Sequence, residues 1–420
     1  MRLDAPFGGL WRDREFRTFW SAQTVSEFGD RITELALPLI AVTMLNASPT
    51  EVGLLTAAVW VPNLLSLFVG AWVEQQHNKR GLMIAADLFR LVVLLSLPFA
   101  YWVDLLSLYQ LYAIAILAGT AHVVFNTAYA AFFVRLVKPV DYLEANSKLS
   151  ATRSLSFMAG PAAGGILIQL VAAPVAMVVD AVTFLISAIQ IGRLRVTTLD
   201  IAPAGESLLR RAAGGMRYLV ANPYLRASLG CATTVNFFNL MGSALLILYA
   251  SRYLDLSAGA IGIAMGVGAS GGLLGAVFAT RLSRLFGLGR LVAIATVVFP
   301  ASLAIVAFAG GPVWLRAVEL GAAEFVGGFA VMCFDIPLVA LQTSVIEDSM
   351  RSRVSGAFLS INYGVRPFGA IVGGLLGGWI GPGETLLVSG LGGIVAVLWL
   401  LRSPILRVNS LEDLRPGEAS

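Results

Sequence analysis

Four charged residues stand inside the first long apolar stretch of the chain, residues 19–45. Glu27, Asp30, Arg31 and Glu34 all fall in its first half and middle. A charged side chain near the middle of a bilayer costs about 3 kcal/mol on insertion scales, so an isolated span could not carry four of them. We therefore expect this helix to face the interior of a helical bundle or an aqueous cavity. Two interpretations stay open: the charges pair and lock helices together, or they form a titratable site in a transport pathway.

A carboxyl group can couple transport to protons when its surroundings change between two states of the protein. Burial at low dielectric favours the protonated acid, whereas a nearby arginine favours the carboxylate. Asp30, Glu34, Glu324 and Arg366 lie deep in apolar runs and are our candidates for proton coupling. Asp30 is the first choice, with Arg366 as its partner from another helix. The alternative for Glu324 and Arg366 is a buried ion pair that only joins two helices.

Other deep polar residues are expected to serve structure. His122 and Asn126 share one helix face at i,i+4 spacing, and His122 is either a hydrogen-bonded interior residue or a proton relay. Arg153, in the fifth span, is expected to be a structural partner of a group in the first or fourth span rather than a substrate anchor. Asp180 and Asp335 are expected near helix ends, as caps or loop partners.

A substrate cavity would be lined by amide and aromatic groups. An unpaired amide is costly in hydrocarbon, so amides inside apolar runs should face a polar interior. For each aromatic residue, packing against lipid is an equally good alternative. The residues that we expect to line the cavity are Trp60, Asn63, His122, Asn126, Asn236, Asn239 and Tyr363.

The composition is that of a polytopic membrane protein. The 420 residues are 57% hydrophobic and only 13% charged, and the mean hydropathy is +0.80, values far from those of soluble domains. Cys231 and Cys333 give neither a disulfide framework nor a metal site, and no phosphate-binding loop or catalytic constellation is visible. We therefore expect no enzyme activity, no cofactor, no metal and no nucleic-acid partner. No cleavable signal peptide is expected, because the first span is too long.

The apolar runs predict an all-α membrane protein with twelve transmembrane helices in two six-helix lobes. Most lysines and arginines fall in alternate loops and in both tails, which places both termini in the cytoplasm by the positive-inside rule. The predicted domains are an N-terminal lobe (1–192), a cytoplasmic linker with an amphipathic helix (193–222), a C-terminal lobe (223–402) and a tail (403–420). The predicted spans are 19–45, 50–73, 81–102, 106–136, 145–171, 174–192, 225–249, 258–280, 288–308, 313–341, 354–380 and 384–401.

The fifth span of each predicted lobe contains proline among glycines. Residues 160–165 read Gly-Pro-Ala-Ala-Gly-Gly, and residues 366–369 read Arg-Pro-Phe-Gly before a further glycine pair. Proline bends a helix and glycines allow a neighbouring helix to approach closely. Gly160, Pro161, Gly164 and Gly165 are therefore expected to control packing and gating between the lobes, with Gly164 the position to test.

The chain resembles the major facilitator superfamily over nearly its whole length. Residues 160–165 are similar to the antiporter motif in helix 5 of that superfamily's drug exporters. Residues 16–20, 29–30 and 36–39 resemble the branch of macrolide-efflux proteins and siderophore exporters. Residues 70–90 resemble the motif between helices 2 and 3, which in the family forms a charge relay that steadies the outward-open state.

The motif at residues 70–90 departs from the family pattern, because Gln75 stands where a cation is expected. Asp87 and Arg90 can still pair at i,i+3 spacing. From the resemblance, the gating residues here are Gly70, Glu74, Asp87 and Arg90.

The resemblance implies a secondary active transporter that exports a small amphipathic or hydrophobic compound, drug-like or siderophore-like, by proton antiport. Its expected place is the inner membrane of a bacterium, as a monomer surrounded by lipid. The alternatives are an importer or facilitator of a small solute or a lipid, and a transport-inactive sensor with the same fold.

Overall fold

The computed structural model describes residues 9–194 and 208–414, and nearly all of them are helical. Within these ranges, nine helices are long and apolar enough to cross a membrane. The α-helices are α1 (Arg14–Leu39), α2 (Pro49–Leu64), α3 (Ser66–Gln75), α4 (Lys79–Trp102), α5 (Leu108–Leu136), α6 (Tyr142–Val171), α7 (Ala173–Arg193), α8 (Leu208–Ala221), α9 (Pro223–Arg252), α10 (Ala258–Phe286), α11 (Leu288–Val306), α12 (Val313–Val345), α13 (Arg351–Gly364), α14 (Arg366–Trp379), α15 (Pro382–Ile394) and α16 (Val397–Leu401).

Three of the predicted spans are divided into two helices. The span 50–73 becomes α2 and α3 with a break at Leu65, the span 354–380 becomes α13 and α14 with a break at Val365, and the span 384–401 becomes α15 and α16. Pro62 and Pro367 lie next to the first two breaks, and each removes a backbone donor and crowds the preceding turn. The first predicted span continues past α1 as a π-helix, Ile40–Met44.

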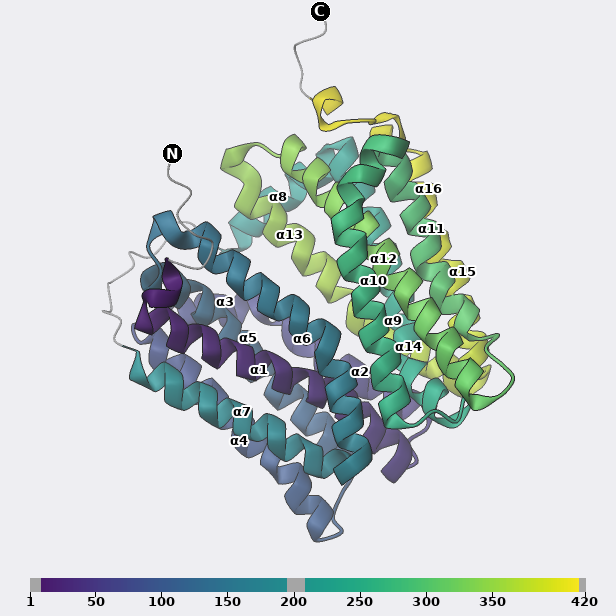
Figure 1. The fold of residues 1–420 in the computed structure, drawn as a ribbon. Coiled ribbons are helices and arrows are strands. Elements are labelled where there is room, and N and C mark those ends of the chain that lie inside the picture. The colour runs from purple at the N-terminus through teal and green to yellow at the C-terminus, as the bar shows by residue number, and fades with distance from the viewer. Residues whose placement is uncertain (1–8, 195–207, 415–420) are drawn as a thin grey trace, which may run out of the picture.

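The helices form two groups, which we call the first half (α1–α7) and the second half (α9–α16). In Figure 1 the first half gathers on the left and the second half on the right, with both chain ends at the top. Within the first half, α7 packs on α1 and α4; within the second, α12 packs on α10 and α11. The main contacts between the halves join α6 to α10 and α2 to α14.

The two halves are closed against each other at the end of the bundle away from the chain termini, here called the closed end. One apolar cluster there contains Ile40 and Leu111 from the first half and Leu248 and Leu256 from the second. Nearer the termini, the apolar clusters of the two halves are separate. Among the described residues, the large apolar cluster shared by the two halves therefore lies at the closed end.

Hydrogen bonds also cross between the halves at the closed end. Arg252, the last residue of α9, donates from Nη1 to the carbonyl oxygen of Ala47 (2.8 Å) and from Nη2 to that of Val42 (2.7 Å). Thr50 Oγ1 donates to the carbonyl oxygen of Gly374 at 3.1 Å. The two Arg252 bonds go to backbone oxygens of the π-helix and of the turn that follows it, where helical partners are missing.

The segment between the halves contains one described helix, α8, which packs on α13. Leu219 of α8 is fully buried there. The rest of the predicted linker, residues 195–207, lies outside the described part of the chain, as do residues 1–8 and 415–420.

Candidate functional site

A polar cluster lies inside the first half, where α1 faces α4, α6 and α7. Arg31 of α1 pairs with Glu34 (Nη1 to Oε2, 2.6 Å) and more loosely with Glu27 (Nη2 to Oε2, 3.9 Å). Its guanidinium also lies over the ring of Phe157 on α6, 4.0 Å from the centroid. The charges of α1 therefore pair with one another, as expected if they serve to hold the helices together. Glu34 is nonetheless half exposed, with 52% of its side chain accessible.

Asp30 pairs with Arg90 of α4, not with Arg366 as we expected. Arg90 Nη2 donates to Asp30 Oδ1, and both side chains are largely enclosed. The Arg90 guanidinium lies over the ring of Phe184 on α7, 3.7 Å from its centroid. The expected ion pair between Arg90 and Asp87 is not formed among the described residues, because Arg90 points to α1.

Asp180 lies inside the cluster, and our expectation of a cap or loop partner was wrong. It is completely buried in α7 and accepts hydrogen bonds from Thr33 Oγ1 of α1 and from Thr183 Oγ1 (3.2 Å). Gly29 makes this approach feasible, because a Cβ there would collide with the Asp180 carboxylate and the Thr183 side chain. One signal was available in the sequence: Asp180 stands seven residues after the first residue of α7, about 10 Å along the helix at 1.5 Å per residue.

Asp87 of α4 completes a group of three carboxyl groups around one arginine. It is buried, and neither of its side-chain oxygens has a hydrogen-bond partner within 9–194 and 208–414. Asp87 and Asp180 both lie close enough to Asp30 and Arg90 to interact with them electrostatically. A low-dielectric site with three acids and one guanidinium cannot hold all three acids ionised without a large energetic cost.

Two further polar groups border this cluster. Arg153 Nε of α6 donates to Glu27 Oε1 at 3.4 Å, which confirms its predicted role as a partner of a helix-1 group. The side chains of His122 and Asn126 on α5 are in contact through Nε2 and Nδ2 at 2.7 Å. His122 also interacts electrostatically with Arg90, Asp30 and Arg31, so it belongs to the same network.

In the second half, Arg366 lies between two aromatic rings. Its guanidinium carbon is 4.3 Å from the centroid of Trp60 and 4.4 Å from that of Tyr363. Trp60 belongs to α2 and Tyr363 to α13, with 6.2 Å between their ring centroids. Two predicted cavity residues thus meet across the two halves around Arg366, whose Nε is buried without a partner among the described residues.

Arg366 does not form the predicted ion pair with Glu324 in the described part of the chain. Glu324 lies instead beside α10, where a Cβ on Gly268 would be 2.9 Å from the Cβ of Glu324. The acid that acts on Arg366 is Asp335. Asp335 stands ten residues before the end of α12 at Val345, so its predicted place near a helix end was also wrong.

The remaining cavity candidates are spread over three helices. Asn236 Nδ2 of α9 bonds the carbonyl oxygen of Ala232 at 3.0 Å, which is a local helix contact. Asn63 of α2 and Asn239 of α9 are half-buried, and Asn126 of α5 is exposed. The structure therefore brings together Trp60, Tyr363 and Arg366.

The glycines of α6 face two different partners. A Cβ on Gly160 would be 2.7 Å from Arg31 Cβ, and one on Gly164 would be 3.3 Å from Ile32 Cα, both in α1 of the same half. A Cβ on Gly165 would be 3.0 Å from Gly262 Cα, and Gly262 in turn lies against the carbonyl oxygen of Pro161. Pro161 and Gly165 therefore contact the second half, whereas Gly160 and Gly164 face α1 of the first half.

The motif of residues 70–90 is open at Gly70 and packed at its two cations, Lys79 and Arg80. A Cβ on Gly70 would meet no atom within 4 Å, and the side chain of Glu74 lies outside the described part of the structure. Lys79 Nζ donates to the carbonyl oxygen of Val73, and Arg80 donates to those of Gly192 and Leu194 (2.7 Å for the latter). The cations of this motif therefore hold the ends of α3 and α7.

These features define a multi-pass helical membrane protein with a buried ionisable network and two halves sealed at one end, as in a transporter. A family model described as "Transmembrane secretion effector" matches residues 5–418, and the chain belongs to this family of the major facilitator superfamily.

Relatives and solved structures agree with this assignment. The chain is 24% identical over 393 residues to the uncharacterised MFS-type transporter YfiS of Bacillus subtilis, covering 91% of each chain. It is 26% identical over 384 residues to the multidrug efflux pump Tap of Mycolicibacterium fortuitum, covering 88% of this chain and 91% of Tap.

The fold resembles a bacterial homologue of the iron transporter ferroportin. In its inward-facing state, that protein gives a TM-score of 0.73 at 16% identity, covering 94% of this chain and 99% of the other. Its outward-facing state gives 0.57 at 15% identity, covering 93% and 99%.

Proposed function

We propose that this protein is a secondary active transporter that exports a small amphipathic or hydrophobic compound from the bacterial cytoplasm in exchange for protons. The observation that carries the proposal is the group of three carboxyl groups around Arg90, those of the buried Asp87 and Asp180 and of the half-buried Asp30. Such a site holds a proton in one state and can release it when its surroundings change. The relationship to an efflux pump supports the direction of transport.

The topology that fits this function has twelve spans in two lobes, with both termini in the cytoplasm. The lobes are residues 1–192 and 223–402, joined by the linker 193–222 and followed by the tail 403–420. Three predicted spans are not among the nine apolar helices. Two of them are divided, into α2 and α3 and into α13 and α14, and the third is α1 with its charges.

Cysteine labelling tests this topology. Cys231 and Cys333 are buried and should give little background. We expect Arg284→Cys to react with a membrane-impermeant maleimide only from the cytoplasmic side. Asp255→Cys, whose native side chain is 69% exposed at the closed end, should react only from outside. The reverse pattern would contradict the orientation.

Transport then proceeds by alternating access. The closed end seals the periplasmic side, and a substrate enters between the halves from the cytoplasm, where Trp60, Tyr363 and Arg366 meet. The contacts of α6 with α10, α2 with α14 and Arg252 with the first loop must break to open the outer side. We expect substrate release to be linked to proton uptake by the acids around Arg90. Glu34, Glu324 and Arg366 are further candidates for proton coupling.

Growth of an expressing strain against a panel of toxic amphipathic compounds tests the function. We expect higher tolerance of at least one compound than in the same strain with an empty vector, and loss of cell-associated compound over time. A protonophore should remove both effects, because it collapses the driving force. Tolerance that persists with the protonophore would rule out proton antiport, and net accumulation of compound would indicate import.

A further inference from the structure

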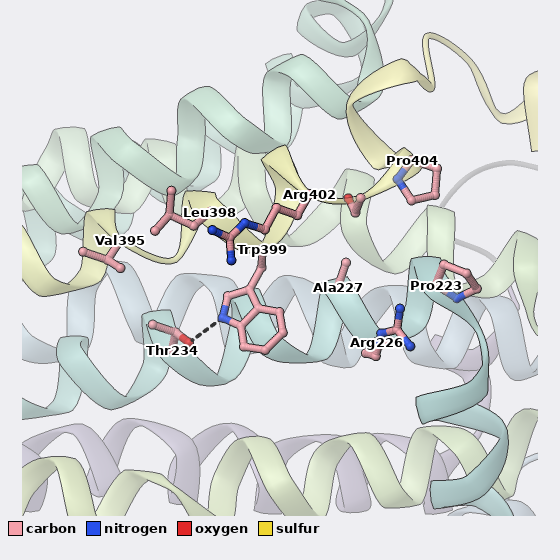
Figure 2. A pocket seen from close by; sticks show the side chains of 10 residues that line it. Pro223, Arg226, Ala227, Thr234, Val395, Leu398, Trp399, Arg402 and Pro404 are labelled. Carbon is pink, nitrogen blue, oxygen red and sulfur yellow. Dashed lines mark hydrogen bonds between the residues drawn. The ribbon is translucent and has the colours of Figure 1, made fainter.

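A groove of about 360 Å³ lies on the second half, between the start of α9 and the end of the last span. Figure 2 shows it with the Trp399 indole between Thr234 and Arg226, and with Arg402 along the other edge of the ring. The residues that line it are Pro223, Arg226, Ala227, Thr234, Val395, Leu398, Trp399, Arg402, Ser403 and Pro404.

The floor of the groove is fixed by specific packing. Trp399 Nε1 donates to Thr234 Oγ1 at 3.2 Å. The indole covers Gly230 of α9, where a Cβ would be 2.7 Å from the ring. After Ile394 the last span tightens, with i to i−3 hydrogen bonds from Val395, Ala396, Leu398 and Trp399. This tightening turns Trp399 onto α9 and leaves a gap at its edge.

The groove carries positive charge without a carboxylate. Arg226 and Arg402 are exposed, and none of the ten residues that line it is acidic. Neither arginine forms an ion pair within residues 9–194 and 208–414. Arg226 makes only a 3.5 Å hydrogen bond to the carbonyl oxygen of Val220. Two guanidinium groups are therefore available to an anion from outside the chain.

The position of the groove is that of the lipid headgroups. Arg402 directly follows the apolar span Pro382–Leu401, and Arg226 lies in the first turn of the span Pro223–Arg252. Tryptophan and arginine are enriched at this level of a membrane. Below the arginines, Leu391, Val395 and Leu398 are 62%, 52% and 45% exposed and continue the groove towards the bilayer core.

We propose that this groove binds an anionic phospholipid, with its phosphodiester between Arg226 and Arg402 and an acyl chain along Leu398, Val395 and Leu391. A free phosphate would use only the arginines and would leave this apolar track uncovered. The proposal does not rest on the transport function, because it concerns the outer face of the second half. Basic pockets beside membrane helices bind acidic lipids through the same combination of contacts.

Native mass spectrometry of the full-length protein tests the proposal. The detergent-solubilised protein is titrated with phosphatidylglycerol and, separately, with phosphatidylcholine of the same acyl chains. We expect phosphatidylglycerol to bind more tightly. The Arg226→Gln/Arg402→Gln double variant should lose about 25-fold in affinity for it, about fivefold for each arginine. Its affinity for phosphatidylcholine should not change.

A matched control uses Arg281→Gln/Arg284→Gln, which removes two other exposed arginines from the end of α10. This variant should bind phosphatidylglycerol like the wild type, and both double variants should have the wild-type melting temperature in detergent. Equal weakening in the two double variants would overturn the proposal, as would equal affinity for the two lipids. Displacement of phosphatidylglycerol by millimolar glycerol phosphate would show a soluble-anion site and would also overturn it. Arg402→Glu should exclude the acidic lipid through repulsion, and retained binding there would count against the site.

Discussion

Gly165→Leu is expected to reduce transport by more than tenfold while the protein remains inserted and folded. A Cβ at this position already meets the backbone of Ala258 and Gly262 on α10, so a leucine cannot be accommodated while α6 and α10 touch. Backbone atoms cannot move aside as a flexible side chain would, and close approach between membrane helices depends on such small residues. The closed end should therefore open, and the state described here should lose population.

A disulfide between Thr50→Cys and Gly378→Cys reports this opening. A Cβ on Gly378 would be 2.7 Å from Thr50 Oγ1, so the pair lies at the seal formed by α2 and α14. We expect rapid cross-linking in the parent and slow cross-linking when Gly165→Leu is added. Ala163→Leu is the matched control, because Ala163 is exposed on α6. Wild-type transport and cross-linking in Gly165→Leu would show that this contact does not govern closure.

The helices could be located from the sequence because an apolar run and its flanking charges mark depth directly. The helix that corresponds to the predicted span 81–102 begins at Lys79 and ends at Trp102, and that for 258–280 begins at Ala258. The breaks at Leu65 and Val365 were not predicted. Proline is tolerated inside α1, α4 and α6, so its presence does not show which helix will divide.

The sequence predicted how deep in the membrane the residues of the candidate site lie, but not which side chains pair with one another. Asp30 is largely enclosed in the bundle, as its surroundings in the sequence require, but its partner is 60 positions away on α4. Sequence spacing fixes the direction of a side chain on its own helix and not the rotation of that helix against its neighbours. For the same reason Asp180 was missed: only the approach of α7 to Gly29 brings it beside Asp30.

Asp30→Asn is expected to abolish uphill export while substrate still binds. Asparagine keeps the size of the side chain and can accept a hydrogen bond from Arg90, but it cannot exchange a proton. Arg90 would then be left with the carboxyl groups of Asp87 and Asp180, and the acid that pairs with it directly would be gone. Without a difference in proton affinity between the two states, a pH gradient cannot bias the transport cycle.

Vesicles with an acidic lumen and inverted orientation provide the measurement, with a compound that the growth panel identifies. The wild type should concentrate the compound in the lumen, whereas Asp30→Asn should only equilibrate it. Asp180→Asn should also lose gradient-driven accumulation, because it removes the second acid at the same arginine. Asp255→Asn is the control: its partner Arg316 lies 3.0 Å away at the exposed closed end, where an ion pair contributes little. Wild-type accumulation by both Asp30→Asn and Asp180→Asn would transfer the coupling role to Glu34 or Glu324. If neutral variants of those two also pump normally, these acids do not carry protons, and the Arg90 cluster only holds α1, α4 and α7 together.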